Sequence, residues 1–318
     1  MSIGTEPLVC AVVVTWNGGE QAVECIRSVQ ESAYPNLPVV VVDNHSDDDT
    51  ATRIVRACPE CTVIEQEQNQ GFAGGANVGF REGIRRGAEY LLLLNQDVVV
   101  AREAVPALVR SAAEDPRIAA VGGKVLFYDE PQRIWSAGAG SRLFWSHTGS
   151  VSFGYGQTDS REHNRTRDVG YVSGCCMLLR ASVIHEIGGF DPRFFMYAED
   201  FDWCERARRA GYRIRYSPQA VIFHRVSVER DVKRMPVVLY YATRNHLYSA
   251  VGWRSGFFRY FWIAIYGLLV IPLRCLLLLA WQVVRLRTVR FQPIGSVLRG
   301  LRDFLANRTG KIEDLMTS

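Results

Sequence analysis

Four side chains in this sequence stand at positions where they could bind a metal ion or move a proton. Asp97 follows the apolar run Tyr90–Leu94, and an acid there is a hard oxygen ligand for a divalent cation that also holds phosphate oxygens. Glu199 and Asp200 stand at the acidic start of a predicted helix, where a carboxylate can act as a general base toward a hydroxyl. His224 ends another apolar run and could be a metal ligand.

Each of these residues also has an ordinary structural interpretation. An acid after a strand is common in turns. Carboxylates at a helix start interact favourably with the helix dipole, and a histidine on an apolar strand can be a buried neutral side chain. Taken singly, none of the four residues therefore assigns a function.

Two further motifs are equally weak when taken alone. The segment Asn69–Gly79 holds four glycines, which let backbone N–H groups approach an anion closely. It is neither a Gly-Lys-Ser/Thr phosphate loop nor a clean GxGxxG motif after a strand. Cys58 and Cys61 have the spacing of half a zinc site, but no second pair follows nearby.

The elements that must position these residues alternate between apolar runs and helical periodicities. This alternation predicts an α/β domain with a mostly parallel sheet flanked by helices. Ligands gather at the carboxyl ends of strands in such sheets, so three polar clusters after strands, Thr15–Asn17, Asp43–Ser46 and Asn95–Asp97, are expected to converge on one site. The predicted strands are Leu8–Thr15, Pro38–Asp43, Cys61–Glu65, Tyr90–Leu94, Gly170–Arg180 and Gln219–His224.

The predicted helices lie between these strands. Glu20–Ser32 has helical spacing, and the glycine-rich segment is expected to lead into a helix that runs through Gly87. A further helix with an acidic start lies within Phe190–Gly211, whereas Pro131–Asp168 is expected to be loop-rich.

Composition fits a folded protein with an uneven distribution of charge. The chain has 318 residues, of which 48% are apolar and 22% charged, and its net charge of +4 is too mild to indicate a nucleic-acid binder. Residues 252–318 carry nine Arg and one Lys against three acids, which leaves a net −3 for residues 1–251. The N-terminus does not resemble a secretory signal, and the eight cysteines are expected to be free thiols of a cytosolic protein.

The basic tail contains the longest apolar stretch, Tyr260–Val284, which has one charge, Arg274. Its length could span a bilayer, but basic residues flank it on both sides, and the positive-inside rule opposes export of either flank. We therefore expect two helices, broken at Pro272, that lie in or dip into the cytoplasmic face of the membrane through residues 257–290. The alternative is a helical pair that packs on the protein or forms an interface in a homo-oligomer.

Taken in order, the motifs are far more specific than any one of them. They read VVVTWNG, VVVDNHSDDDT, NQGFAGGANVG, LLLLNQDV, VSGCCMLLR and IGGFDPRFFMYAEDFDWCERARRAG, followed by the strand that ends in His224. This order resembles the inverting family-2 glycosyltransferases of the GT-A fold, in particular their bacterial rhamnosyltransferase-like branch. The resemblance covers about residues 7–250 and implies a catalytic domain over 1–250. The basic apolar tail described above then makes 251–318 a membrane-associating helical segment.

The resemblance implies that eleven positions line the pocket of a nucleotide-sugar donor. Asp43 would accept the N3–H of a uracil or thymine ring, with Asn44 beside it, and Asn77 would brace the glycine-rich loop. Arg244, in the segment YYATRNHLY, would meet phosphates of the donor or acceptor. The implied set is Thr15, Trp16, Asn17, Asp43, Asn44, Asn69, Gly71, Phe72, Asn77, Asn95 and Arg244.

The resemblance also assigns the metal and the chemistry. Asp97, where the family's DxD motif ends, and His224 would hold Mg²⁺ or Mn²⁺ on the diphosphate, although Asn95 replaces the motif's first acid. Asp200 would be the catalytic base, and Glu199 would orient it or bind the acceptor. One displacement at the anomeric carbon would then invert its stereochemistry.

These features predict an inverting, metal-dependent glycosyltransferase. The Gln-x-x-Arg-Trp motif of processive relatives is absent from the sequence, so addition of one or a few sugars is expected. L-Rhamnose from dTDP-rhamnose is the favoured donor, with UDP-linked galactofuranose, glucose and N-acetylhexosamine left open, and the acceptor would be a saccharide or a polyprenyl-diphosphate glycan. A catalytically inactive nucleotide-binding regulator stays open as an alternative, whereas a nucleotidylyltransferase would need basic residues where Trp16–Gly19 stands.

Overall fold

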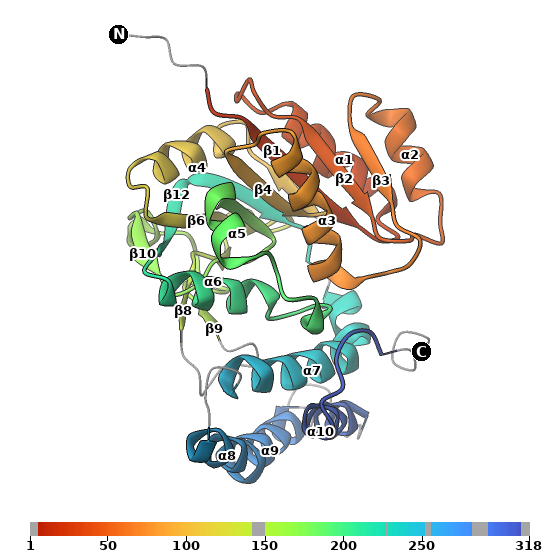
Figure 1. The fold of residues 1–318 in the computed structure, drawn as a ribbon, viewed down its shortest axis with the longest axis vertical. Helices are drawn as coiled ribbons and strands as arrows, with labels where there is room; N and C mark the ends of the chain where they lie inside the picture. The colour runs from red at the N-terminus through yellow and green to blue at the C-terminus, as the bar shows by residue number, and fades with distance from the viewer. Residues whose placement is uncertain (1–5, 142–149, 227, 252–255, 282–291, 313–318) are drawn as a thin grey trace. The chain divides into compact units, whose positions relative to one another are not determined.

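The computed structural model describes residues 6–141, 150–226, 228–251, 256–281 and 292–312 (Figure 1). These residues pack into two compact units. The first contains the described parts of residues 1–141, 151–192 and 200–226, and the second contains residues 193–199 together with the described residues after 227. The second unit therefore begins ahead of residue 250, at which the family resemblance ends.

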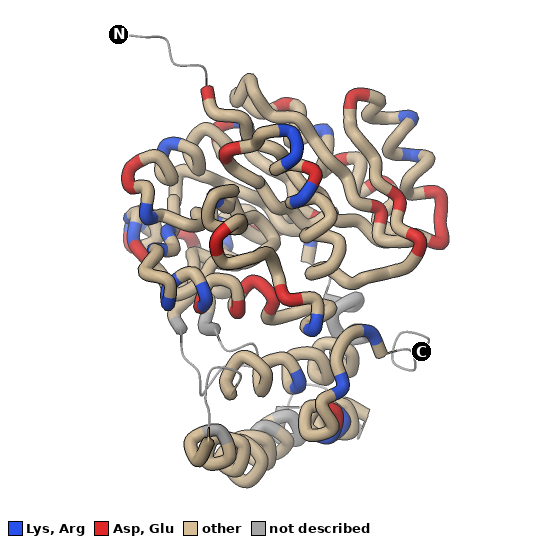
Figure 2. The backbone as a smooth tube through the Cα atoms, in the orientation of Figure 1, with Lys and Arg blue, Asp and Glu red and all other residues tan. Residues whose placement is uncertain are grey.

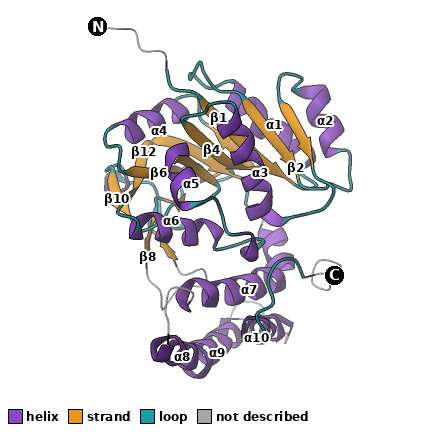
Figure 3. Ribbon diagram, in the orientation of Figure 1, coloured by secondary structure: helices purple, strands orange, loops and turns teal. Residues whose placement is uncertain are grey.

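The first unit contains both strands and helices, and the secondary structure described after residue 227 consists of helices (Figure 3). The strands are β1 (Val9–Thr15), β2 (Val39–Asp43), β3 (Thr62–Glu65), β4 (Tyr90–Asn95), β5 (Val98–Val100), β6 (Ile118–Phe127), β7 (Ile134–Ser136), β8 (Ala139–Ser141), β9 (Ser150–Ser152), β10 (Arg167–Val169), β11 (Cys176–Arg180) and β12 (Arg213–His224). The helices are α1 (Gly19–Gln30), α2 (Thr50–Ala57), α3 (Gly71–Arg85), α4 (Ala104–Ala113), α5 (Ala181–Ile187), α6 (Glu199–Arg209), α7 (Val228–Val251), α8 (Gly256–Ile265), α9 (Ile271–Trp281) and α10 (Gln292–Leu305), with short turns η1 (Arg161–His163), η2 (Pro192–Phe194) and η3 (Tyr266–Val270).

A ten-stranded sheet in the order β10-β12-β6-β11-β4-β1-β2-β3, with β5 beside β12 and β7 beside β6, forms the centre of the first unit. The strands β3, β2, β1 and β4 are all parallel, as the sequence predicts for this part of the chain. Beyond β4 the sheet is mixed, because β11 runs antiparallel to both β4 and β6 while β12 runs parallel to β6.

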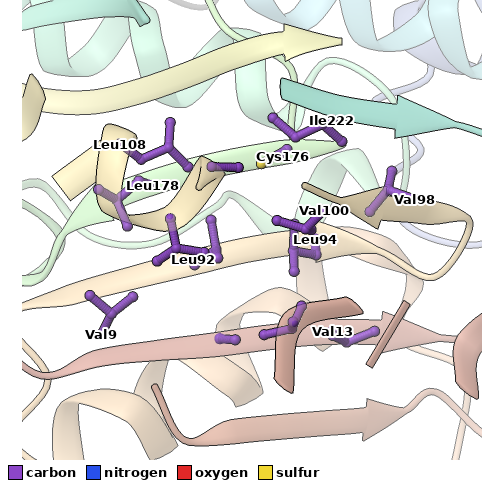
Figure 4. Close-up of a cluster of buried hydrophobic side chains, with 14 of the residues drawn as sticks. Val9, Val13, Leu92, Leu94, Val98, Val100, Leu108, Cys176, Leu178 and Ile222 are labelled. Atoms are coloured by element: carbon purple, nitrogen blue, oxygen red, sulfur yellow. The ribbon is translucent and has the colours of Figure 1, made fainter. Parts of the chain in front are cut away.

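The parallel strands are buried on both faces because helices cover both. Every residue of β1 is buried, which fits its β-branched sequence VCAVVVT. On one face α1, α2 and α4 pack against alternate strand residues such as Val13, Leu92 and Leu94 (Figure 4). On the other face α3, α5 and α6 pack against residues such as Val12 and Leu93.

The glycine-rich segment is itself helical, because α3 begins at Gly71. Its glycines serve close packing on the sheet. A Cβ atom on Gly79 would lie 2.1 Å from Cγ1 of Val12, and one on Gly83 would lie 2.3 Å from Cδ2 of Leu91. A larger side chain at either position would push the helix off the strands.

In the second unit, α7 and α10 pack together with the apolar helix that runs from α8 through α9. The break that the sequence predicts at Pro272 is wrong, since α8, η3 and α9 follow one another without interruption from residue 256 to residue 281. Proline cannot donate to the carbonyl four residues earlier. The π-helical turn η3 bonds over five residues and so accommodates this missing donor.

The π turn also sets which face of this helix is buried. Tyr266 and Ile271 lie five residues apart, one π turn, and both pack into the shared apolar cluster. The opposite face is unusually apolar for an exposed surface. Its exposed side chains include Phe257, Phe258, Tyr260, Phe261, Leu268, Leu269, Leu273, Leu276 and Leu277.

Candidate active site

The ends of β1, β2 and β4 meet at one edge of the sheet and are joined by hydrogen bonds. The hydroxyl of Thr15 and the backbone N–H of Trp16 both donate to Oε1 of Gln96, at 2.7 and 2.8 Å. The backbone N–H of Asn17 donates to the hydroxyl of Ser46 at 2.9 Å. The three polar clusters predicted after these strands are therefore brought together.

Asp43 and Asn44 end β2 and use their side chains differently. The hydroxyl and the backbone N–H of Ser46 both donate to the carboxylate of Asp43, which is buried at the strand end. The amide of Asn44 donates to Oδ1 of Asn69 at 3.0 Å and to the carbonyl of Gly71 at 2.9 Å. Asn44 thus braces the start of α3, and Asp43 is fixed beside it.

Asp97 and His224 meet because of the strand pairing next to them. Asp97 directly precedes β5, and β5 pairs antiparallel with β12 so that Val98 lies opposite His224. Nε2 of His224 lies 3.3 Å from Oδ1 of Asp97, and Trp135 packs against the imidazole ring with the ring centroids 4.6 Å apart.

The contacts of this pair suit a metal ion. Oδ1 of Asp97 is buried and has no hydrogen-bond partner among the described residues. A buried anionic oxygen without a donor is costly, and a carboxylate oxygen beside an imidazole nitrogen is a donor set that divalent cations accept. The described residues contain no group of three or more His, Cys, Asp and Glu side chains suited to a metal.

Asp200 lies in the first turn of α6 and is held by two neighbouring segments. Its Oδ2 accepts hydrogen bonds from the hydroxyl of Tyr171 at 2.9 Å and from the backbone N–H of Gly174 at 2.8 Å. Its Oδ1 accepts one from the backbone N–H of Phe201 at 2.7 Å. Burial raises the pKa of this carboxyl above the ordinary aspartate value, although the three hydrogen bonds act in the opposite direction.

Cys175 and Gly174 link the two acidic positions. The backbone N–H of Asn95, at the end of β4, donates to the carbonyl of Cys175 at 3.1 Å. Burial is the main cause that raises the pKa of the Cys175 thiol, and the charges of Asp97 and Asp200 raise it further. A Cβ atom on Gly174 would lie 3.2 Å from the ring of Phe72 and 3.4 Å from Oδ2 of Asp200.

Three expected site residues have contacts of another kind. Arg244 is fully buried, and its guanidinium donates to backbone carbonyls, including that of Gly310 at 2.9 Å, so it does not present a free charge to phosphates. Asn77 makes two hydrogen bonds with the backbone of Phe190 and braces that segment rather than its own helix. Glu199 is the buried first residue of α6 and belongs to the second unit.

A sequence profile described as "Glycosyltransferase like family 2" matches residues 7–238. The chain belongs to the family-2 glycosyltransferases. It is therefore an enzyme that transfers a sugar, and we set aside the inactive regulator and the nucleotidylyltransferase.

Relatives and solved structures agree with this assignment. The chain is 27% identical over 231 residues to the N-acetylglucosaminyl-diphospho-decaprenol L-rhamnosyltransferase of Mycobacterium tuberculosis, covering 67% of this chain and 74% of that protein. It is also 27% identical to a low-salt glycan biosynthesis hexosyltransferase of Haloferax volcanii, over 86% of this chain and 84% of that one.

A mannosyltransferase from Pyrobaculum calidifontis, solved with GDP-Man and Mn²⁺, superposes with a TM-score of 0.61. The sequences are 17% identical, and the match covers 96% of this chain and 89% of that one. At this identity the likeness concerns the fold alone, and it confirms the predicted α/β architecture.

Three residues of this candidate site have no clear signal in the sequence. In the sequence, Gln96 is only the middle residue of a strand-end cluster. In the structure its side chain joins the end of β1 to the end of β4 through Thr15 and Trp16. Tyr171 and Gly174 gave no signal because their partner, Asp200, lies more than 25 residues away in the chain. The sequence YVSG before an apolar strand is compatible with many turns, so only the fold reveals these contacts.

Proposed function

We propose that this glycosyltransferase is an inverting, metal-dependent enzyme that adds one or a few sugars from a nucleoside-diphosphate donor. The observation that carries the proposal is the buried carboxylate of Asp200, which is held by Tyr171 and Gly174. The carbonyl of Cys175, the residue after Gly174, accepts the backbone N–H of Asn95, two residues before Asp97. A base and a cation site at one sheet edge are what a single displacement at the anomeric carbon requires.

In the proposed reaction, Asp200 takes the proton of the attacking acceptor hydroxyl. Oδ2 of Asp200 already accepts two hydrogen bonds, whereas Oδ1 accepts one from Phe201 and keeps capacity for another. The acceptor oxygen forms the new bond to the anomeric carbon while the bond to the diphosphate breaks. Because attack and departure occur on opposite faces, the product is inverted.

The cation, Mg²⁺ or Mn²⁺, would be held by Asp97 and His224. When bound, it supplies positive charge against the leaving diphosphate. The relative from Pyrobaculum calidifontis was solved with Mn²⁺, which agrees with this class of ion. His224 would ligate through Nε2 in its neutral form, with Trp135 limiting its rotation.

The nucleotide would bind at the ends of β1 and β2. We propose that Asp43 accepts the N3–H of a uracil or thymine ring and that Trp16, which is partly exposed, lies against the nucleoside. Gln96 fixes the backbone of Trp16 at both its N–H and its carbonyl. Phe72 and Asn69, at the start of α3, would border the ribose.

L-Rhamnose is the donor sugar that we propose, and a lipid-linked or free saccharide is the proposed acceptor. The proposal is supported by the similarity to the mycobacterial L-rhamnosyltransferase, whose name specifies an N-acetylglucosaminyl-diphospho-decaprenol acceptor. The donors left open are UDP-linked galactofuranose, glucose and N-acetylhexosamine.

Transfer assays would test the reaction and the base together. Purified enzyme with Mn²⁺ is incubated with dTDP-rhamnose or one of the open donors and with a polyprenyl-diphosphate N-acetylglucosamine acceptor. We expect Asp200→Asn to lower kcat about 10²–10⁴-fold, the usual contribution of a general base, while dTDP and UDP bind as tightly as to the parent enzyme. Normal turnover by Asp200→Asn, or no transfer from any donor, would contradict the proposal.

We also propose that residues 1–250 form the catalytic domain and that 251–318 associate with the cytoplasmic face of a membrane. By length and composition, Gly256–Leu277 could cross a membrane, and only 12% of its most apolar window is buried. Residues 252–318 carry ten basic residues against three acids, and this positive charge would attract anionic lipid headgroups. The apolar face of α8, η3 and α9 would insert beside them.

Vesicle sedimentation would test this membrane association. Phe257 and Phe261 are exposed and stack on each other with ring centroids 6.0 Å apart. Replacing both by Asp should weaken binding to phosphatidylglycerol vesicles at least about tenfold, since one buried Phe contributes about 1.5–3 kcal/mol. Val55→Asp, at an exposed apolar position of α2, is the matched control. Equal sedimentation of all three proteins would refute the assignment.

A further inference from the structure

The segment that leads into Glu199 and Asp200 has an unusual backbone. Three of its residues, Phe195, Tyr197 and Ala198, have positive φ angles of 63°, 65° and 73°. The left-handed region is unfavourable for residues with a Cβ atom, and such residues persist only where their surroundings hold them in place. The chain then enters α6 at Glu199, the position directly before Asp200.

Asn245 of α7 is the main contact that holds this backbone. Its side-chain amide donates to the carbonyl oxygens of Phe194, Met196 and Tyr197, each at 2.8 Å. Asn245 is fully buried. One side chain therefore binds three of four consecutive carbonyls, which is possible only while the segment keeps its curled conformation.

Arg244, the neighbouring residue on α7, extends the same set of bonds. Its Nη2 donates to the carbonyl oxygens of Arg193 and Phe194 at 3.2 and 3.1 Å. Its Nε donates to Oδ1 of Asn245 at 2.9 Å, which orients the amide toward the carbonyls. In addition, Phe195 stacks on Tyr241 with the ring centroids 5.5 Å apart.

We propose that Arg244 and Asn245 are positioning residues for catalysis: they hold the left-handed backbone of residues 193–198, which sets where the base Asp200 enters α6. This inference rests on the proposed function of Asp200. Arg244 and Asn245 are both buried and both donate to backbone carbonyls of this segment, so they would act on the reaction through the segment and not by contact with the substrate. Their role replaces the phosphate contact that the sequence predicts for Arg244.

The first test separates turnover from nucleotide binding. Asn245→Ala should lower kcat about 100-fold, because displacing a catalytic group by about 1 Å costs roughly that much. Binding of dTDP and UDP in the presence of Mn²⁺ should stay within about twofold, which is less than the loss of one typical hydrogen bond would cost. The Asn245 amide donates to carbonyls of residues 194–197 and not to the strand ends where we propose that the nucleotide binds. Leu247→Ala is the matched control: Leu247 is a buried residue of α7 in the shared apolar cluster, and it contacts none of these carbonyls by a hydrogen bond. It should lower the melting temperature and leave kcat unchanged.

The second test uses the strain itself. Glycine adopts a positive φ freely, so Ala198→Gly lowers the penalty of the active conformation. Added to Asn245→Ala, it should recover kcat about fivefold or more, as expected from the cost of one left-handed residue. A purely structural role for Asn245 predicts no such rescue.

Hydrogen exchange gives a readout that needs no donor. Peptides covering residues 193–200 should exchange faster in Asn245→Ala than in the parent enzyme, and at the parental rate in Leu247→Ala. The inference is overturned if Asn245→Ala turns over normally, if Ala198→Gly gives no rescue, or if exchange is unchanged. A fully active Asp200→Asn variant would instead refute the proposed function, so the two failures are distinguishable.

Discussion

The ends of β1, β2 and β4, called here the nucleotide edge because we propose that the nucleotide binds there, and the segment before Asp200 are built in opposite ways. At the nucleotide edge, parallel pairing places Thr15 opposite Asp43 and Val14 opposite Asn95, so backbone register alone brings the polar residues together. Before Asp200, left-handed residues are held by the side chains of Arg244 and Asn245, which come about 50 residues later in the chain. The first region is therefore formed by regular strand pairing, whereas the second is an irregular backbone held by side-chain contacts.

This difference indicates in which region a substitution should leave the backbone framework of the enzyme intact. The nucleotide edge rests on strands whose hydrogen bonds do not depend on any one side chain, so a substitution there should alter contacts and leave the framework in place. The segment before Asp200 concentrates its support in two adjacent side chains. Figure 2 shows acidic residues along the loop that follows β2 and again at the start of α6, so both regions present carboxylates although they are supported differently.

The largest effect on turnover in this comparison is expected from loss of a metal ligand. Asp97→Asn removes the negative charge beside His224 and keeps the size of the side chain. Removing even an outer-shell partner of a metal ligand costs about 10–100-fold in affinity or activity, so we expect the Mn²⁺ concentration for half-maximal turnover to rise by at least that much. Chelation by EDTA should abolish transfer by the parent enzyme, and added Mn²⁺ or Mg²⁺ should restore it.

A matched acid elsewhere serves as the control for this prediction. Asp129 is exposed in the turn after β6, and Asp129→Asn should leave the metal titration unchanged. If the two variants respond alike, or if EDTA has no effect, the pair Asp97–His224 does not bind the catalytic cation.

The sequence predicts well that the polar strand ends converge at one edge of the sheet, and it predicts the contacts before Asp200 poorly, for physical reasons. Apolar runs that end in polar residues report strand ends directly, and parallel strands must align those ends. The glycines of α3 are harder to interpret from the sequence, because glycine permits both anion binding and close helix packing. The close approach of Gly79 to Val12 and of Gly83 to Leu91 shows a packing role for these two. The π turn at Tyr266–Val270 has no sequence signal beyond Pro272 itself.

The contacts of Asp200 and Arg244 could not be predicted because they are long-range and polar. Tyr171 and Asp200 lie 29 residues apart, and Arg244 and Phe194 lie 50 apart. No periodicity records such pairs. The family resemblance therefore implied a phosphate contact for Arg244, whereas the fold buries its side chain among backbone carbonyls.

A smaller effect on turnover is expected at Tyr171, together with a change in pH dependence. The hydroxyl of Tyr171 stabilises the charged form of Asp200 and so lowers its pKa, against the larger effect of burial. Tyr171→Phe removes this donor, so the pKa of Asp200 rises. Because the base must be deprotonated, the acid limb of the kcat–pH profile should move to higher pH, and kcat at its plateau should fall about five- to tenfold.

The sign of this pH shift discriminates between roles for Tyr171. If Tyr171 only filled space, Phe would serve equally, and both the plateau and the acid limb would stay in place. A shift of the limb to lower pH would mean that Asp200 became more solvated, which would contradict a simple loss of one donor.

The smallest effect on turnover is expected from alanine substitutions at two glycines, Gly79 of the first unit and Gly295 of the second. These substitutions should change stability instead, because the space around the two glycines differs. A Cβ atom on Gly79 would meet Val12 at 2.1 Å, whereas one on Gly295 of α10 would meet nothing within 4 Å. Gly79→Ala should therefore lower the free energy of unfolding by about 1–3 kcal/mol through overpacking. Gly295→Ala should raise it by about 0.4–1 kcal/mol, because it restricts the unfolded chain and keeps the helix. Urea unfolding of both variants measures this difference, and kcat of the folded fraction should match the parent enzyme in each. Equal destabilisation by both substitutions would show that α3 does not depend on close contact with β1.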